Sequence, residues 1–209
     1  HSFAREEGEE GYFLISAHIL LVHGHIMPLT TRLLALRGEV PVSPLFREIL
    51  RDLLQLLQGE LEGLDSANRM AVYEARDRVY LQVLAREEAL YQRIAITLEK
   101  HHLAHGADPR QALQILQLDR ALCPRRGGET TLQRRFGYDA RAAFAALAAM
   151  ELPTLPPPQE AQGHEWELEI HHPGGVGEIL QVADGGSWLR GIIREAPAQG
   201  SDVQYVAIA

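Results

Sequence analysis

Residues 11–31 contain no Asp, Glu, Lys or Arg, and this uncharged run limits the possible folds more than any other feature. It also carries three histidines, His18, His23 and His25. A helix of this kind is buried in a core, buried against a partner or inserted in a membrane. About twenty residues can span a bilayer, but three histidines, a glycine and a proline make a poor spanning segment. We therefore expect the run to be buried within a helical bundle.

The overall composition is that of a globular domain. The 209 residues are 46% hydrophobic and 23% charged, which argues against overall disorder. The net charge of -8 argues against a nucleic-acid partner, because binding the phosphate backbone needs a positive surface. The single cysteine, Cys123, excludes an internal disulfide and a cysteine-built zinc site, and it suits a reducing compartment.

The first 106 residues are expected to form a three-helix antiparallel bundle. The first helix is predicted over residues 3–37, and Gly38 supplies its stop. Pro28 lies inside this helix and removes one backbone donor, so a kink is expected near His25. Long helices joined by short turns then favour an antiparallel arrangement.

The second and third helices of this bundle show apolar positions at helical spacing. Ser43 can cap the free amides of the second helix, and Pro44 fits its first turn. Apolar side chains recur in this helix at steps of three and four residues: Leu45, Ile49, Leu53, Leu57, Leu61 and Leu64. The third helix is predicted over residues 65–105, with Asp65 or Ser66 as its cap.

The rest of the chain changes character twice. Residues 107–152 are predicted to hold shorter helices, at 110–122 and 138–150, separated by a basic loop at 124–135. A proline-rich spacer over residues 153–162 marks a domain boundary. Residues 163–209 then alternate apolar and polar side chains, as in a small antiparallel β segment. Strands are predicted at residues 166–170, 178–182 and 188–194. The expected fold class is mainly α: an antiparallel helical bundle followed by a small β-rich C-terminal appendage, α+β overall.

His18 and His25 are the candidate metal-binding residues. They are seven residues apart and share a face of a continuous helix, whereas His23 points elsewhere. Two imidazoles two turns apart lie about 10 Å from each other along the axis, too far to hold one ion without ligands from another helix. The alternative is structural: polar rings buried in the bundle and bonded to the backbone or to hydroxyls such as those of Ser16 or Thr30.

The one basic cluster of the chain is the candidate interaction surface. Its arginines lie around two consecutive glycines: Arg120, Arg125, Arg126, Arg134 and Arg135. Such a cluster can bind phosphate or an anionic membrane surface, and the alternative is a solvated loop. No P-loop, Gly-x-Ser-x-Gly elbow or dinucleotide fingerprint occurs. The sequence therefore favours a non-enzymatic role without a cofactor, although an enzyme with a site between bundle and tail stays open.

An apolar helix with a small, polar centre precedes a second helix that opens on a serine and a proline. The features are Val22-His23-Gly24-His25 at the centre, Arg32 and Arg37 at the exit, and Ser43-Pro44-Leu45-Phe46 at the second opening. In these features residues 12–64 resemble a cytosolic helical hairpin of the fusaric-acid-resistance, aromatic-acid-exporter family of bacterial inner-membrane proteins. The resemblance implies a position at the cytoplasmic side of a membrane, and it carries over no catalytic residue.

The first functional hypothesis is a non-enzymatic helical interaction or scaffold module, a cytosolic part of a larger bacterial, transporter-like membrane protein. Its partners would be other segments of a longer chain, another protein, a second copy of itself or an anionic membrane surface. The alternative is a small-molecule or metal-binding sensor with a pocket between helices near His18 and His25. Because the chain begins with His, we expect a processed chain or a piece of a longer one.

Overall fold

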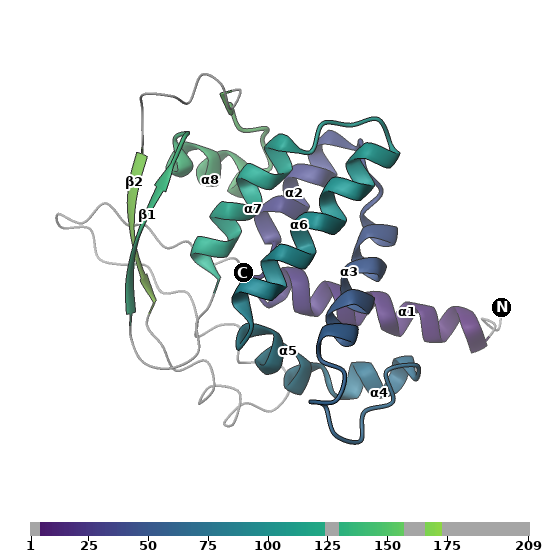
Figure 1. Cartoon of the computed structure of the whole chain (residues 1–209). Coiled ribbons are helices and arrows are strands. Elements are labelled where there is room, and N and C mark those ends of the chain that lie inside the picture. The colour runs from purple at the N-terminus through teal and green to yellow at the C-terminus, as the bar shows by residue number, and fades with distance from the viewer. Residues whose placement is uncertain (1–4, 124–129, 157–165, 173–209) are drawn as a thin grey trace.

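The computed structural model describes residues 5–123, 130–156 and 166–172. These residues form a mainly helical fold with one two-stranded antiparallel sheet, which confirms the predicted class. The elements are α1 (Arg5–His18), the π-helix η1 (Ile19–His23), α2 (Pro28–Arg37), α3 (Val42–Leu56), α4 (Arg69–Glu74), α5 (Arg76–Leu84), α6 (Glu87–Ala104), α7 (Arg110–Leu122), β1 (Thr130–Phe136), α8 (Ala140–Ala148) and β2 (Trp166–His172). The helices pack around one core, and the sheet lies along one side of them (Figure 1).

The predicted first helix is divided, and the expectation of one continuous helix is wrong. α1 runs into η1, the chain leaves helical geometry at Gly24, and α2 begins at Pro28 after a bend of 111°. The position of the break agrees with the predicted kink, because Pro28 supplies no backbone donor to the preceding turn. Burial is confirmed for most of this region: residues 20–30 are buried apart from Val22 and His23.

Two tyrosines from distant helices bind the carbonyl groups that the break leaves open. The Tyr80 hydroxyl donates to the Gly24 carbonyl over 2.9 Å, and the Tyr91 hydroxyl donates to the Ile26 carbonyl over 2.6 Å. Both side chains are almost fully buried. The broken backbone is therefore satisfied by tertiary hydrogen bonds in place of helical ones.

We predict that Tyr91→Phe lowers the free energy of unfolding by about 1–2 kcal/mol, because the Ile26 carbonyl is left buried without its donor. Urea denaturation measures this. Tyr12→Phe is the control, since the Tyr12 side chain is 38% exposed. Equal stability of the two variants would show that the Tyr91 hydroxyl does not support the break.

α3 carries the apolar stripe that the sequence predicted, but its ends differ. Leu45, Ile49 and Leu53 are buried, as expected. The helix begins at Val42, with Pro41 as its N-cap and no side-chain cap, so the predicted capping role of Ser43 is wrong. It ends at Leu56 because the following turns contain two glycines in the left-handed region, Gly59 at φ 90° and Gly63 at φ 74°.

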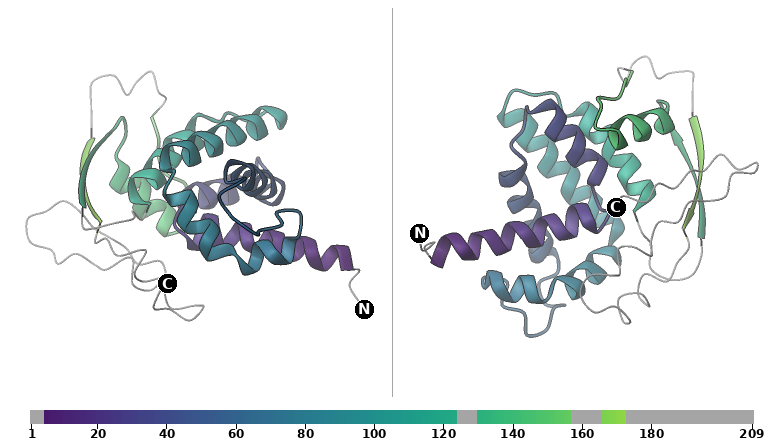
Figure 2. Two further views of the ribbon diagram at one scale, coloured as in Figure 1. Left: turned by 60° about the horizontal axis from the view of Figure 1, so that its bottom comes forward. Right: turned by 180° about the vertical axis from the view of Figure 1, so that it is seen from behind.

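The third predicted helix is three helices, α4, α5 and α6, and the expectation of one long helix is wrong. Asn68 caps α4, its side-chain oxygen accepting from the Met70 and Ala71 amides, where Asp65 or Ser66 was expected. The chain bends at Ala75 and again at Arg86, neither of which is a helix breaker. The bends allow the segment to contact two different helices: α4 lies beside α1 (Figure 2), and α6 packs against α3.

The sheet joins two segments that flank the proline-rich spacer. β1 pairs with β2 in antiparallel register, with Leu132 opposite Ile170. The loop predicted over residues 124–135 is therefore wrong for its second half, which lies in β1, because pairing with β2 overrides its polar composition. The helix at 110–122 and the strand at 166–170 are confirmed, and the strands predicted at 178–182 and 188–194 lie outside the described residues.

Candidate functional site

The structure pairs His18 with His23 rather than with His25. In an α-helix, residues five apart point about 140° away from each other. In the π-turn, the Gly24 amide donates to the Ile19 carbonyl five residues earlier, so positions five apart lie on the same face. The two ring centres are 5.0 Å apart, edge to face. Partial burial, followed by the nearby His23, lowers the pKa of the largely exposed His18.

His25 has a separate environment. It lies in the break at φ 55°, an uncommon conformation for a residue with a side chain, and it is 9% exposed. Burial, followed by the charge of His23, lowers its pKa to about 4, so the ring is neutral at physiological pH. The shared helix face expected for His18 and His25 does not form because the helix ends between them.

The hydroxyl groups expected to bind the histidines have other partners. The Ser16 hydroxyl donates to the Tyr12 carbonyl over 2.8 Å, and the Thr30 hydroxyl donates to the Asp119 carboxylate over 2.7 Å. Within residues 5–123, 130–156 and 166–172, no group of three His, Cys, Asp or Glu side chains is placed to hold a metal ion.

The predicted basic cluster is divided among different elements. Arg120 on α7 forms ion pairs with Glu87 and Glu88 at the start of α6, with N–O distances of 2.9 Å and 2.6 Å. Arg134 and Arg135 are consecutive residues of β1, so their side chains leave opposite faces of the sheet. Arg125 and Arg126 lie outside the described residues. Arg120 is thus neutralised by a neighbouring helix.

Asp119 is the most deeply buried ionisable acid among the described residues. Its carboxylate accepts hydrogen bonds from the Leu29 amide, the Thr30 amide and the Thr30 hydroxyl, and so caps α2 from a helix about 90 positions later in the chain. Burial raises its pKa to about 7, although the bonds from Thr30 and Leu29 act in the opposite direction. These contacts explain Asp119 as a structural cap.

Cavities lined by described residues open on the surface of the helices, and two of them contain candidate ligand-binding side chains. We call the first the arginine pocket, and its volume is about 420 Å³. It is lined by residues of α1, α3 and the segment before α4: Glu10, Phe13, Arg51, Leu54, Gln55, Gln58, Ser66, Ala67 and Arg69. We call the second the histidine pocket, with a volume of about 400 Å³. It is lined by Leu14, Ile15, His18, Ile19, His23, Val42, Ser43 and Phe46.

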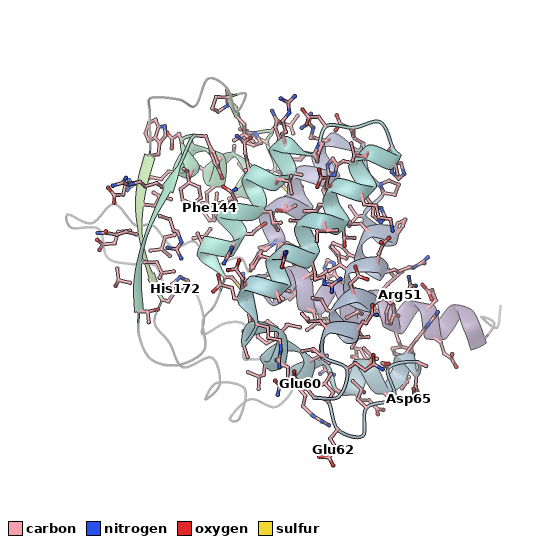
Figure 3. All side chains as sticks on the ribbon, in the orientation of Figure 1. Arg51, Glu60, Glu62, Asp65, Phe144 and His172 are labelled. Carbon is pink, nitrogen blue, oxygen red and sulfur yellow. The ribbon has the colours of Figure 1, made fainter. Side chains whose placement is uncertain are left out.

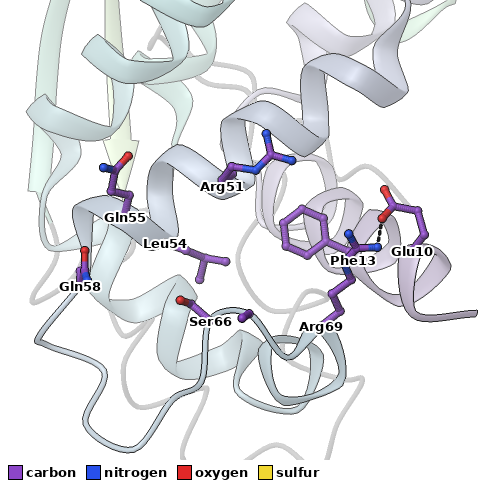
Figure 4. A pocket seen from close by; sticks show the side chains of 9 residues that line it. Glu10, Phe13, Arg51, Leu54, Gln55, Gln58, Ser66 and Arg69 are labelled. Carbon is purple, nitrogen blue, oxygen red and sulfur yellow. Dashed lines mark hydrogen bonds and ion pairs between the residues drawn. The ribbon is translucent and has the colours of Figure 1, made fainter. Parts of the chain in front are cut away.

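The arginine pocket combines an apolar floor with a polar rim (Figure 4). Phe13 and Leu54 are buried, each 7% exposed, and form the floor. The Arg69 guanidinium lies 5.7 Å from the centre of the Phe13 ring and is ion-paired with Glu10. Glu10 also pairs with Arg47, with an N–O distance of 2.5 Å. The one carboxylate of the lining is therefore already neutralised.

Arg51 differs from the other arginines of this region. No hydrogen bond or ion pair with any described residue engages its guanidinium, which projects from the outer side of α3 (Figure 3). Arg51 and Arg69 give the lining two positive charges, and Glu10 gives it one negative charge. The pocket thus has a net positive charge on a chain whose total is -8.

Sequence periodicity does not predict the arginine pocket. Arg51 is expected as a solvated residue opposite the leucine stripe of α3, and Arg69 as part of a long third helix. Only the turn after α3 brings the two arginines to one cavity. The available signal was the alternation of arginine with leucine along α3, which is typical of any amphipathic helix.

No single helix in the described part of the chain has both the length and the apolarity to cross a bilayer. Gly8–His23 and Pro28–Arg37 meet the two criteria only together, and the 111° bend separates them.

Comparisons of the chain with protein-family models, with curated proteins and with solved structures found no match. The chemistry of its own residues is therefore the basis for inferring its function.

Proposed function

We propose that the chain is a non-enzymatic helical binding module that holds a small organic anion in the arginine pocket. The observation that carries the proposal is the Arg51 guanidinium, which no described residue engages, above the apolar floor of Phe13 and Leu54. The ligand class is a carboxylate or phosphate attached to an apolar or aromatic body. The alternative hypothesis from the sequence is a small-molecule-binding module with a pocket near His18 and His25. We keep the binding function and assign it to the arginine pocket.

The polar lining suits an anion because it consists mainly of donors. Two guanidinium groups, two carboxamides and one hydroxyl surround the cavity, at Arg51, Arg69, Gln55, Gln58 and Ser66. Arginine binds carboxylate and phosphate oxygens through paired N–H groups. The volume of about 420 Å³ lies in the range of small-molecule sites. An apolar body would contact the Phe13 ring while the anionic group contacts Arg51.

The side chains that line the arginine pocket favour a binding function over a catalytic one. The described residues that line the pocket include no histidine or cysteine, and their one carboxylate, that of Glu10, is ion-paired with two arginines. The Ser66 hydroxyl therefore has no general base among the described lining residues to activate it as a nucleophile. The polar groups can orient and neutralise an anion.

The test is calorimetric titration with phenyl phosphate. We expect Arg51→Gln to weaken binding about 10- to 100-fold, because a hydrogen bond to a charged group contributes about 1.5–3 kcal/mol. Inorganic phosphate should bind more weakly than phenyl phosphate, and benzyl alcohol, which lacks the charge, should bind weakest.

Arg93→Gln is the matched control. Arg93 is also an exposed helical arginine, on α6, whose guanidinium makes no hydrogen bond or ion pair with a described residue. This variant should bind phenyl phosphate like the wild type. If Arg51→Gln and Arg93→Gln bind equally, the pocket does not hold the anion.

We also propose, from the family resemblance of residues 12–64, that this module is a cytosolic part of a larger membrane-associated protein. Ligand binding in the arginine pocket would then act on another segment of that protein. The full-length reading frame tests this: flanking transmembrane segments support it, and a start codon just before His1 with a stop just after Ala209 contradicts it.

A further inference from the structure

We propose that His18 and His23 form a two-imidazole site for a divalent transition metal of the zinc class. The proposal uses the histidine pocket and does not depend on the anion site. Its basis is the π-turn, which places the two rings side by side at the edge of a cavity. π-turns inside helices are frequent at functional sites, because they re-aim side chains that an α-helix would separate.

The ring separation fits a shared ion. Zinc–nitrogen bonds are about 2.0–2.1 Å long, so two imidazoles on one ion have ring centres about 5.0–5.5 Å apart at bond angles near those of a tetrahedron. The observed distance between the centres of His18 and His23 is 5.0 Å, and the rings meet at an interplanar angle of 74°. The separation of the ring centres therefore lies at the lower end of the range for two ligands of one metal ion, and small rotations of the two side chains would set the nitrogen positions.

The ring nitrogens of both residues are available. His18 and His23 are exposed, and no hydrogen bond links either ring to a residue in the described part of the chain. The pair formed by His101 and His105 on α6 differs: its rings are stacked with centres 6.4 Å apart, His101 Nε2 contacts Glu48 over 2.9 Å, and His105 Nδ1 contacts the His101 carbonyl over 2.8 Å. That pair is occupied and serves as a comparison.

The surroundings select the class of metal. The described lining residues include no carboxylate, and among them Ser43 provides the one side-chain oxygen. Magnesium and calcium need several oxygen ligands, whereas imidazole suits zinc, copper and nickel. Phe46, with its ring centre 6.3 Å from that of His18, walls the site on the apolar side. Water or the Ser43 hydroxyl would complete the coordination.

Calorimetric titration with Zn²⁺ tests the site. We expect the double variant His18→Gln, His23→Gln to lose one equivalent of bound Zn²⁺, and each single variant to bind that equivalent at least tenfold more weakly. The double variant His101→Gln, His105→Gln should keep it, and excess Mg²⁺ should not compete. Unchanged Zn²⁺ stoichiometry and affinity in the first double variant would overturn the proposal.

A second measurement on the wild-type chain covers the case in which the variants fold poorly. Diethyl pyrocarbonate modifies exposed imidazoles, and peptide mass spectrometry locates the products. Zn²⁺ should protect His18 and His23 at concentrations that leave the exposed His105 reactive. Modification of His18 and His23 at the same rate with and without Zn²⁺ would also overturn the site.

Discussion

Replacing Gly24 with alanine is expected to lower the free energy of unfolding by about 3 kcal/mol, with a fall in the melting temperature of about 6–12 °C. A Cβ at this position would lie 2.3 Å from the Leu20 carbonyl oxygen and 2.7 Å from Cε2 of Tyr80. The backbone at Gly24 is ordinary for alanine, at φ -75° and ψ 4°, so the cost is steric. Relief would require moving the π-turn or the buried Tyr80 ring, which donates to the Gly24 carbonyl.

Thermal and urea denaturation of the variant measure this cost, and Gly11→Ala is the matched control. Gly11 lies in α1, where an added Cβ meets no atom within 4 Å. Alanine there should raise stability by about 0.5–1 kcal/mol, because it favours the helix more than glycine does. Opposite signs for the two variants are expected. A Gly24→Ala protein as stable as the wild type would show that the break tolerates a side chain.

Replacing Asp119 with alanine is expected to cost about 3–5 kcal/mol. The carboxylate accepts from the Leu29 amide, the Thr30 amide and the Thr30 hydroxyl at 3.0, 2.8 and 2.7 Å. Alanine would leave all three donors buried, and each unsatisfied donor costs about 1–3 kcal/mol. Met27, the N-cap residue of α2, makes no side-chain cap, so no local group replaces the carboxylate.

Asp139→Ala is the control for Asp119→Ala in urea denaturation. Asp139 also caps a helix, α8, by accepting from the Arg141 and Ala142 amides. It is a local and partly exposed cap, so its loss should cost about 1 kcal/mol. Equal losses in the two variants would mean that burial of the Asp119 cap adds nothing to its contribution.

The pH dependence of the same measurement tests the burial of Asp119. Its pKa is raised to about 7 in the folded chain from an ordinary value of about 3.8. The folded chain therefore holds a proton that the unfolded chain releases, and this contribution to stability falls as pH rises from about 4 to about 7. The Asn side chain of Asp119→Asn cannot titrate. The free energy of unfolding of the wild type should therefore fall relative to that of this variant as pH rises over that range. Parallel pH profiles would contradict the shift.

The histidines show where inference from the sequence alone stops. An uncharged run with three imidazoles predicted burial in a bundle, and most of residues 20–30 is buried. The pairing of the rings depended on whether the turn before Gly24 is α-helical or π-helical. That choice is stabilised by Tyr80 and Tyr91, which come from helices more than 50 positions later. No local pattern contains this information.

The arginines show the same limit at the candidate sites. Charge density in the sequence pointed to the cluster from Arg120 to Arg135, but Arg120 is neutralised by Glu87 and Glu88. Arg51 is locally indistinguishable from any solvated helical arginine. It becomes a candidate ligand contact because the turn after α3 brings Arg69 to the same cavity and because no carboxylate of the described chain pairs with it.

The sequence by itself determined the mainly helical class, the stripe of α3, the bounds of α7, the stop at Gly38 and the strand after the spacer. The stop at Gly38 depends on a single glycine, and the other features depend on residues two, three or four positions apart, whose periodicity can be read from the sequence. The tertiary structure decided the 111° bend, the division of the third helix, the pairing of β1 with β2 and the capping of α2 by Asp119. These depend on contacts between distant residues, where packing and buried hydrogen bonds outweigh local preference.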